Sequence, residues 1–294
     1  MALKQQGRPG FSARIASCEA DARAGSPHLW AMLDHHDTVR VVDLETTGSR
    51  PPADGVVEIG WQDVEHHASG WHLGAGRGAR YVHPERPIPA RTSAVHHIVD
   101  EDVADAPPWE RVAPPVLAAP GIAALAAHRA DFERRWCTDR LAGGLPWVCT
   151  WKCALRLWPD LPSHSNQGLR YERRPDGLDR ALGLPAHRAG PDAYVTAHHL
   201  RDMLNAVGLE QLIAWTREPA LLVRVPYGPL RGRLWREVDD AHLAEVLARD
   251  TGDRDVRFTA RQEQARRAAR AGGTGELTRR AGGHARGTRP VETG

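Results

Sequence analysis

Residues 41–48, VVDLETTG, place two acids two positions apart at the end of an apolar run. Val41 and Val42 are β-branched, so the run is typical of a buried strand. Side chains of a strand alternate between its faces, which puts Asp43 and Glu45 on the same side. Two carboxylates at one spot repel each other unless a cation lies between them. This stretch therefore predicts either a divalent-metal site at a strand end or two harmless acids at a solvated edge.

The composition favours a soluble globular enzyme over a disordered or membrane protein. The 294 residues are 41% apolar and 26% charged, as in an ordinary folded domain. Apolar runs such as residues 122–127 are too short to cross a bilayer. Residues 1–10 lack the apolar core of a signal peptide, so we expect a cytoplasmic protein without a membrane partner. The four cysteines show no zinc-site spacing, so we expect reduced thiols.

The two ends of the chain differ in composition from its middle. Residues 251–294 contain ten Arg against five acids, whereas the whole chain has a net charge of +2. Because this stretch is also rich in Gly and Ala, it predicts a disordered Arg/Gly-rich tail. Residues 1–37 mix charges with Gly and Pro, and they predict a poorly ordered N-terminal extension.

Strand patterns precede and then alternate with helix patterns in the middle of the chain. We predict strands, the first two paired antiparallel, over residues 39–47, 56–64, 79–84, 122–128 and 144–150. We predict helices over residues 131–142, 151–158 and 191–208, and one short helix within 107–120. In the last long helix, Pro191 opens and Gly208 closes the pattern. This order predicts an α/β fold with a mixed central sheet covered by helices.

Further acids follow the later elements. Two-metal phosphoryl chemistry needs carboxylates that converge from different elements and a base for the attacking water. Residues 128–136, HRADFERRW, supply acids after a predicted buried strand, and Asp192 lies in the first turn of the last long helix. His187 precedes this helix on a loop, and an imidazole with a pKa near 6.5 suits the base. Sixteen histidines make any single one unremarkable, but the ordered set favours a metal-dependent hydrolase.

The order of these motifs resembles the DEDDh family of 3′–5′ exonucleases, which is related to polymerase proofreading subunits. VVDLETTG, then HRADFE, then HRAGPDA follow the family's order. Residues 94–103, 147–169, 187–204 and 223–250 are similar to segments of the exodeoxyribonuclease X group within that family. Together these segments cover about residues 38–250, which is most of the chain.

The resemblance implies a ribonuclease-H-like fold with an exonuclease domain over 38–208 and a small C-terminal module over 216–250. It implies hydrolysis of phosphodiester bonds at DNA 3′ ends with release of mononucleotides. Two Mg²⁺ or Mn²⁺ ions would be the cofactors. A role in DNA repair or proofreading would follow from that activity.

The resemblance also gives each motif residue a role. Asp43 would bridge both metals, Glu45 would bind one metal and the 3′ hydroxyl, and Asp192 would hold the catalytic metal. His187 would be the general base. The residues expected to approach the substrate are Thr46, Thr47, Gly48 and His96.

The middle motif departs from the family pattern, His-Asn-Ala-x-Phe-Asp. Here residues 128–133 read HRADFE, and alignment on Phe132 puts Glu133 where the second-metal Asp belongs. The extra methylene lengthens the reach by roughly 1 Å, and a misplacement of that size can cost on the order of 100-fold in rate. Asp131 is the rival ligand, although a helix N-cap is its more common role. Arg129 in place of Asn is either a phosphate contact or drift.

The C-terminal module also departs from the similar motif, Phe-Gly-Lys-x-Arg-Gly-Lys. The chain has YGPLRGR at residues 227–233. Tyr227 is a candidate for stacking on a base, and Arg231 and Arg233 are candidates for phosphate binding. An exposed turn with no ligand explains the same residues equally well.

Three functions agree with these patterns. The first is an active exonuclease on single- or double-stranded DNA 3′ ends. The second is a nucleic-acid-binding module of the same fold whose catalysis is impaired by the altered middle motif. The third is an exonuclease that trims RNA 3′ ends, because the choice between DNA and RNA depends on how the site treats the 2′ hydroxyl. The retained acids and histidine favour the first.

Overall fold

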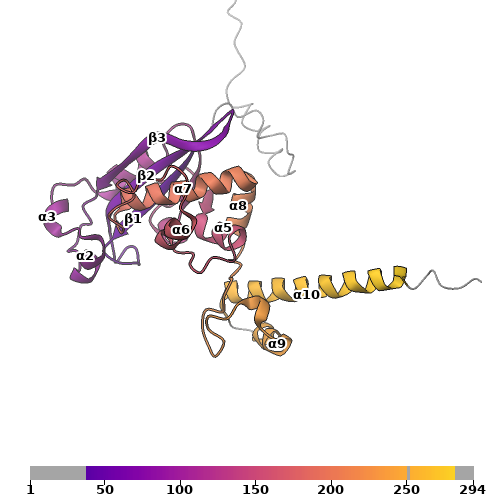
Figure 1. Ribbon diagram of the computed structural model, residues 1–294. Helices are drawn as coiled ribbons and strands as arrows, with labels where there is room; N and C mark the ends of the chain where they lie inside the picture. Colours follow the sequence, from indigo (N-terminus) through magenta and orange to yellow (C-terminus); the bar gives the residue numbers. More distant parts are fainter. Residues whose placement is uncertain (1–37, 250–251, 282–294) are drawn as a thin grey trace, which may run out of the picture. The chain divides into compact units, whose positions relative to one another are not determined.

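The computed structural model describes residues 38–249 and 252–281, without the side chains of 271–281. The predicted N-terminal extension, residues 1–37, lies outside the described residues, as do 250–251 and 282–294. In Figure 1 the described chain begins at the strands, drawn in indigo, and ends in the yellow helix α10. Cys137, Cys149 and Cys153 are buried and free, as the sequence predicts for reduced thiols.

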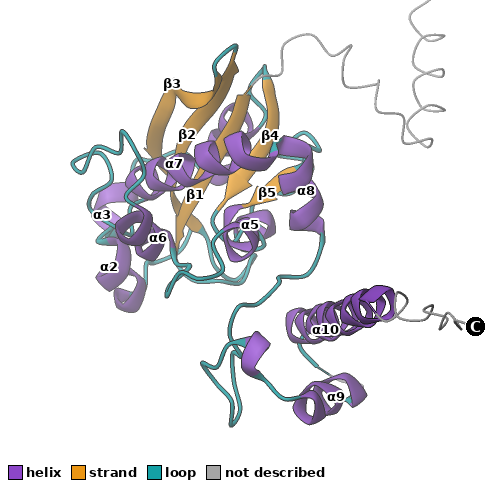
Figure 2. Cartoon of the chain, turned by 45° about the vertical axis from the view of Figure 1, so that its right-hand side comes forward, coloured by secondary structure: helices purple, strands orange, loops and turns teal. Residues whose placement is uncertain are grey.

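A five-stranded mixed sheet forms the centre of the fold (Figure 2). The order of the strands across the sheet is β3-β2-β1-β4-β5. β1 pairs antiparallel with β2 and parallel with β4, so it is the middle strand and is covered on both sides. The strands are β1 Thr38–Thr46, β2 Val56–His67, β3 Gly70–Tyr81, β4 Ile122–Ala127 and β5 Trp147–Cys149. The predicted α/β class and mixed sheet are confirmed.

Helices pack on both faces of this sheet. The first group lies on one face and at one end of the sheet: α2 Ala90–His96, α3 Asp100–Val103, α4 Trp109–Leu117 and the 3₁₀ turn η2 Glu133–Arg135. The second group covers the other face: α5 Thr150–Leu157, α6 Asn166–Arg173, α7 Ala189–Val207 and α8 Leu209–Arg217. The C-terminal elements are η3 Trp235–Glu237, α9 Asp240–Ala248 and α10 Arg254–Ala281. The long helix α7 contacts β1, β2 and β3.

Side chains of β1 alternate between the two faces of the sheet, and this explains how one strand contributes both to the core and to the site. Val39 and Val41 are fully buried in the cluster that includes the inner face of α7. Val42 and Leu44 point the other way, into the cluster that includes α4. Because the side-chain period of a strand is two, Asp43 continues the α7 face beyond the last valine. The same pattern that buries β1 therefore aims its acids at α7.

Gly60 of β2 lets α7 approach the sheet closely. Gly60 pairs with Asp43 in the β1–β2 register. A Cβ atom on Gly60 would lie 2.1 Å from the carbonyl carbon of Ala189, so any larger residue would push the start of α7 away. The missing side chain therefore brings the first turn of α7 next to the end of β1.

Two predicted elements differ from the structure. The third strand is much longer than the predicted residues 79–84. The prediction missed its first half because that half is rich in glycine and lacks an apolar pattern. Residues 131–142 form turns and the short η2 in place of a predicted helix. Repeated four-residue turns, such as Cys137 N–H to Glu133 O at 2.8 Å and Ala142 N–H to Thr138 O at 2.9 Å, keep helical spacing without a continuous helix.

The exonuclease domain extends beyond its predicted C-terminal end. The exonuclease domain was expected to end at 208, but α8 packs Leu212 into the core beside α5. The backbone N–H of Cys149 also donates to Thr216 Oγ at 2.8 Å. The compact unit therefore includes α8.

The C-terminal module includes part of the predicted tail. Val225, Trp235 and Leu243 share a buried cluster with Val256 and Ala260, which lie on α10. The prediction of disorder from residue 251 is therefore wrong for the start of α10. Small and apolar residues on one side of this Arg-rich stretch give it a face to bury, which composition alone does not reveal. None of the helices in the described part of the chain is long and apolar enough to span a membrane.

Candidate active site

Three of the predicted metal ligands converge at the end of β1. Asp43 and Glu45 come from β1, and Asp192 comes from the first turn of α7. One carboxylate oxygen from each lies within 4.8 Å of the other two. The carboxylates are partly or fully buried, so water screens their repulsion poorly. This arrangement suits a divalent cation with oxygen ligands.

The electrostatics of the cluster show what this convergence costs without a cation. Burial, followed by the charges of Asp192 and Glu45, raises the pKa of Asp43 well above its ordinary value. Burial, followed by the charge of Asp192, raises the pKa of Glu45 to about 8. Both shifts disfavour the charged carboxylates, and a bound cation would favour them again.

Asp192 is held in place by groups that sequence reasoning missed. Gln167 Nε2 donates to Asp192 Oδ1 at 2.7 Å, and Asn166 Nδ2 donates to the same oxygen at 3.2 Å. The backbone N–H of His187 donates to Asp192 Oδ2 at 2.6 Å. Asn166 and Gln167 begin α6, directly after the cap Ser165. Polar residues in the first turn after a helix cap are common, so the sequence carried no specific signal for this pair.

Glu133 faces the cluster, whereas Asp131 does not. Glu133 is 3% exposed, and its Oε2 has no hydrogen-bond partner among the described residues. Burial is the main cause that raises the pKa of Glu133 to about 8, and the charge of Glu45 adds to it. The Asp131 side chain is 65% exposed and lies 3.5 Å from Lys152 Nζ. Glu133 lies outside the group of three carboxylates that converge within 4.8 Å, but its burial near them makes it, and not Asp131, the candidate for the fourth acid.

The predicted cap role of Asp131 is wrong. The short η2 has Phe132 as its N-cap, and no side chain caps it. Asp131 instead forms ion pairs with Lys152 and, at 3.9 Å, with Arg134. A 3₁₀ turn of three residues leaves few backbone N–H groups for a cap to satisfy.

His187 lies on an exposed loop, and its contact with the three acids is through its backbone N–H, which binds Asp192. Its backbone adopts a left-handed conformation with φ of 60°. The next residue, Arg188, forms two hydrogen bonds to Glu58 on β2, at 2.7 and 3.0 Å. Ala189 follows and starts α7. The predicted base thus lies five residues before Asp192 and directly before the anchored residue Arg188.

A cavity of about 600 Å³ lies beside Glu45. Its lining includes Thr46, Gly48, His96 and Phe132, so three predicted substrate residues share one cavity. His96 is 2% exposed, and its Nδ1 accepts a hydrogen bond from the backbone N–H of Ile98 at 3.0 Å. Burial lowers the pKa of His96, so this ring is neutral at pH 7.

Thr47, the fourth predicted residue of this group, has a different position. Its side chain is buried, and its Oγ accepts a hydrogen bond from the backbone N–H of Gly55 at 2.9 Å. The Thr47 N–H donates in turn to the Gly55 carbonyl at 2.9 Å. Thr47 therefore closes the loop between β1 and β2 and does not line the cavity.

The remaining residues of the middle motif frame the site. His128 bonds through its two ring nitrogens to Thr150 Oγ at 3.0 Å and to the His164 carbonyl at 2.9 Å. Burial lowers its pKa to about 4, so this ring is a neutral structural group. The guanidinium of Arg129 lies over the ring of Trp151, 4.3 Å from its centre. Arg129 is exposed, which leaves its predicted phosphate contact open to test.

Arg231 and Arg233 lie in the C-terminal module. They are exposed on a turn in which the Arg231 N–H donates to the Gly228 carbonyl at 3.1 Å. Tyr227 on the same turn is 51% exposed. The turn holds these side chains in solvent, and their predicted contact with DNA stays a prediction.

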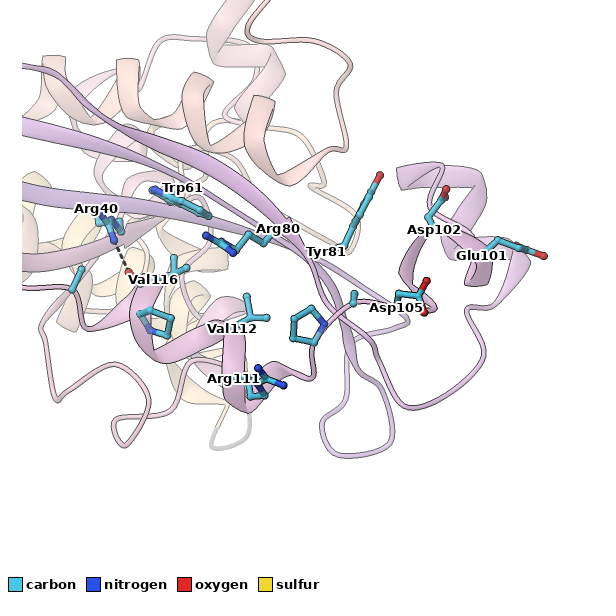
Figure 3. Close-up of a pocket in the computed structure, with 14 residues that line it drawn as sticks. Arg40, Trp61, Arg80, Tyr81, Glu101, Asp102, Asp105, Arg111, Val112 and Val116 are labelled. Carbon is cyan, nitrogen blue, oxygen red and sulfur yellow. Dashed lines mark hydrogen bonds between the residues drawn. The ribbon is translucent and has the colours of Figure 1, made fainter.

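A larger cavity, of about 830 Å³, lies between the sheet and α4 (Figure 3). Trp61 and Arg80 stand toward one end of it, and Glu101 and Asp102 stand at the other. Trp61 pairs with Val42 in the sheet register and so points to the face opposite Asp43 and Glu45. This cavity is therefore separate from the carboxylate cluster.

Comparison with known proteins agrees with this geometry. The sequence pattern of the RNase_T exonuclease family matches residues 41–200, which span all the acids of the cluster. The chain belongs to this exonuclease family. The match begins on β1 and ends on α7, so it covers both elements that supply the carboxylates of the exonuclease.

Individual proteins similar to this exonuclease include an exodeoxyribonuclease and a DNA polymerase. It is 34% identical over 216 residues to exodeoxyribonuclease 10 of Escherichia coli K12, which covers 73% of this chain and 87% of the relative. It is 29% identical over 185 residues to the PolC-type DNA polymerase III of Thermotoga petrophila, covering 60% of this chain and 13% of that protein. A solved structure of exonuclease X with 5′ overhanging duplex DNA is 34% identical and covers 60% of this chain and 99% of its own, with a TM-score of 0.49.

Proposed function

We propose that this exonuclease removes mononucleotides from the 3′ ends of DNA by metal-assisted hydrolysis. The observation that carries the proposal is the convergence of Asp43, Glu45 and Asp192 within 4.8 Å of one another. A fold gains nothing from three such carboxylates in a poorly solvated place unless a cation neutralises them. The identity with an exodeoxyribonuclease supports DNA as the substrate.

The residues present fit divalent metal ions. Asp43, Glu45 and Asp192 would hold them, and Glu133 adds a buried Oε2 that has no other partner in the described chain. Hard oxygen ligands of this kind suit Mg²⁺ or Mn²⁺, and we propose two ions. Bound there, such ions stabilise the negative charge that develops on the phosphate and the leaving oxygen.

The chain's own groups would do the remaining work. We propose that His187 takes a proton from the attacking water, because its exposed loop lets the imidazole reach the edge of the cluster. Thr46, Gly48 and His96 would shape the cavity for the terminal nucleotide beside Glu45. In the C-terminal module, Arg231 and Arg233 would contact phosphates of the strand.

The retained cluster favours catalysis over mere binding. The alignment on Phe132 puts Glu133 in the place of the family's Asp, and its charge acts on Asp43 while that of Glu45 acts on it. These interactions support the proposal that the altered middle motif still supplies a carboxylate to the site. A role in DNA repair or proofreading remains a prediction from the resemblance.

The proposal is tested with matched DNA and RNA strands labelled at either end. Incubation with Mg²⁺ should release labelled mononucleotide at once from the 3′-labelled DNA, whereas a 5′ label should remain on progressively shorter products. Faster release from RNA would replace DNA by RNA as the substrate. Binding of both strands without release in Mg²⁺ or Mn²⁺ would favour the binding module.

A further inference from the structure

We propose that Glu58 is a positioning residue, which together with Arg188 fixes the loop that carries His187. The inference deepens the proposed function, since it rests on His187 as the base of the hydrolysis. Glu58 does not line the proposed substrate cavity. Its charge does act on Asp43 and Glu45, so the test has to separate an effect through the loop from a direct effect on these acids.

Glu58 is a buried acid with three hydrogen bonds, all to the segment that follows His187. It lies on β2, directly opposite Glu45 in the antiparallel register, and is 3% exposed. Its Oε1 accepts from Arg188 Nη2 at 2.7 Å, and its Oε2 accepts from Arg188 Nε at 3.0 Å. The backbone N–H of Ala189 also donates to Oε2, at 2.9 Å. This side chain therefore ties two consecutive residues to the sheet.

The conformation of His187 depends on restraints from both sides. A histidine with φ of 60° is in a sparsely populated region, which persists only when its surroundings hold it there. On one side, the His187 N–H is bound to Asp192 Oδ2 at 2.6 Å. On the other side, Arg188 and Ala189 are bound to Glu58. Loss of the second restraint would let the loop relax and move the imidazole.

Glu58 also replaces a missing helix cap. Arg188 is the N-cap residue of α7 and makes no side-chain capping bond. The carboxylate of Glu58, on β2, accepts the hydrogen bond from the first backbone N–H of α7 instead. Its negative charge also interacts favourably with the positive end of the helix dipole. Arg188 in turn keeps its position through a second contact, in which its Nη2 donates to Tyr81 Oη at 3.0 Å. The start of α7 is thus fixed to β2 by an ion pair and to β3 by a hydrogen bond.

The matched control lies on the same strand. Asp63 of β2 forms a comparable buried pair with Arg40, with contacts of 2.7 and 2.8 Å, and Arg40 also donates to the Val116 carbonyl on α4. This pair does not contact the His187 loop. Asp63→Asn therefore removes a similar ion pair from the sheet without releasing the proposed base.

The experiment measures kcat and KM on a 3′-labelled DNA strand for Glu58→Gln, Asp63→Asn and His187→Ala, and for the double variant Glu58→Gln/His187→Ala. Glu58→Gln should lower kcat by about 10- to 100-fold, the scale expected for misplacement of a catalytic group, with KM changed less than about threefold. Asp63→Asn should keep kcat within about threefold of wild type. In the His187→Ala background the same Glu58 substitution should change kcat by less than about twofold, because the group that it positions is gone.

Each other outcome overturns the inference. Equal kcat losses from Glu58→Gln and Asp63→Asn, or a Glu58 effect that persists without His187, would show a general structural role. If Glu58→Gln does not fold, Arg188→Lys keeps a cation beside Glu58 but loses the two-pronged contact, and an unchanged kcat in this variant would refute the positioning role. Wild-type protein that leaves DNA intact would refute the proposed function itself, whereas an active wild type with a fully active Glu58→Gln would refute only this inference.

Discussion

Replacement of Glu133 by glutamine should stabilise the metal-free protein while it removes most of the activity. Glutamine has the shape of a protonated glutamate but cannot ionise. The Glu133 carboxylate is buried, and its pKa is raised to about 8, chiefly by burial. Burial disfavours the charged form of this carboxylate in the metal-free protein. Such a carboxylate is expected at a cation site, because a bound metal ion stabilises the charged form.

The size of the effect follows from proton linkage. An acid whose pKa is raised on folding contributes most stability below its unfolded pKa, about 4.5, and this stability is lost as the pH rises to its folded pKa, about 8. At about 1.36 kcal/mol per pH unit, the rise from 4.5 to 7 destabilises the fold by about 3 kcal/mol. The glutamine variant escapes this loss. At pH 5 the same arithmetic leaves a gain of less than about 1 kcal/mol.

Thermal unfolding in EDTA measures the difference. For a domain of this size, about 3 kcal/mol corresponds to an increase in Tm of roughly 6–12 °C at pH 7, which should shrink strongly at pH 5. In Mg²⁺, Glu133→Gln should lose about 100-fold or more in kcat. Asp131→Asn is the control, since this exposed side chain should alter stability by less than about 1 kcal/mol and leave turnover intact. A Tm gain that is absent, or equal at both pH values, would refute the linkage argument, and a dead Asp131→Asn would make Asp131 the ligand.

His187→Ala should lower kcat by about 100-fold or more, as expected for loss of a general base, and a variant within a few-fold of wild type would exclude His187 from the mechanism. Gln167→Ala removes the 2.7 Å hydrogen bond to Asp192 and should lower the affinity for Mg²⁺ by about 10- to 100-fold. The rate should then need a higher Mg²⁺ concentration, and an unchanged Mg²⁺ dependence would show that Gln167 does not orient Asp192. Removal of residues 271–294, which contain four Arg, should weaken DNA binding at low salt and flatten its salt dependence by roughly 0.7–0.9 per lost phosphate contact. Turnover at saturating DNA should persist, and an identical salt slope would show that these residues do not bind DNA.

The sequence predicted the centre of the fold because each central element carries its own periodic signal. β1 and β4 are apolar runs bounded by turns, and α7 has apolar residues at helical spacing with Gly208 after its end. These three elements bring Asp43, Glu45 and Asp192 together, so the predicted acids also met in space. The identity of the metal ligands remains a prediction until metal binding is measured.

The errors have a common physical origin in contacts between distant segments. The first half of β3 is a strand only because β2 pairs with it, and its glycines give no local signal for one. The helical spacing of residues 131–142 reflects a series of turns whose direction is set by the burial of Trp136 and Leu141 in the core. Burial of Val256 and Ala260 orders the start of α10 in the same way.

The supporting residues of the site could not be predicted for the same reason. Glu58 lies 130 positions before its partner Arg188, and Asn166 and Gln167 reach Asp192 from a separate helix. Neither pair forms a motif of fixed spacing. The register of β2 against β1 and the close approach of α7 at Gly60 bring Glu58 to Arg188, and the packing of α6 on α7 brings Asn166 and Gln167 to Asp192.

The most direct test of the proposed metal-dependent 3′–5′ cleavage is the release of mononucleotide from a 3′-labelled DNA strand, measured for wild type and Asp43→Ala with Mg²⁺ and with excess EDTA. The carboxylate cluster predicts steady release by the wild type in Mg²⁺ and only background release in EDTA. Asp43→Ala should stay at background in both conditions, because the acid between Glu45 and Asp192 is gone. Full release by the wild type in EDTA, or by Asp43→Ala in Mg²⁺, would contradict a mechanism in which these carboxylates hold the catalytic metal ions.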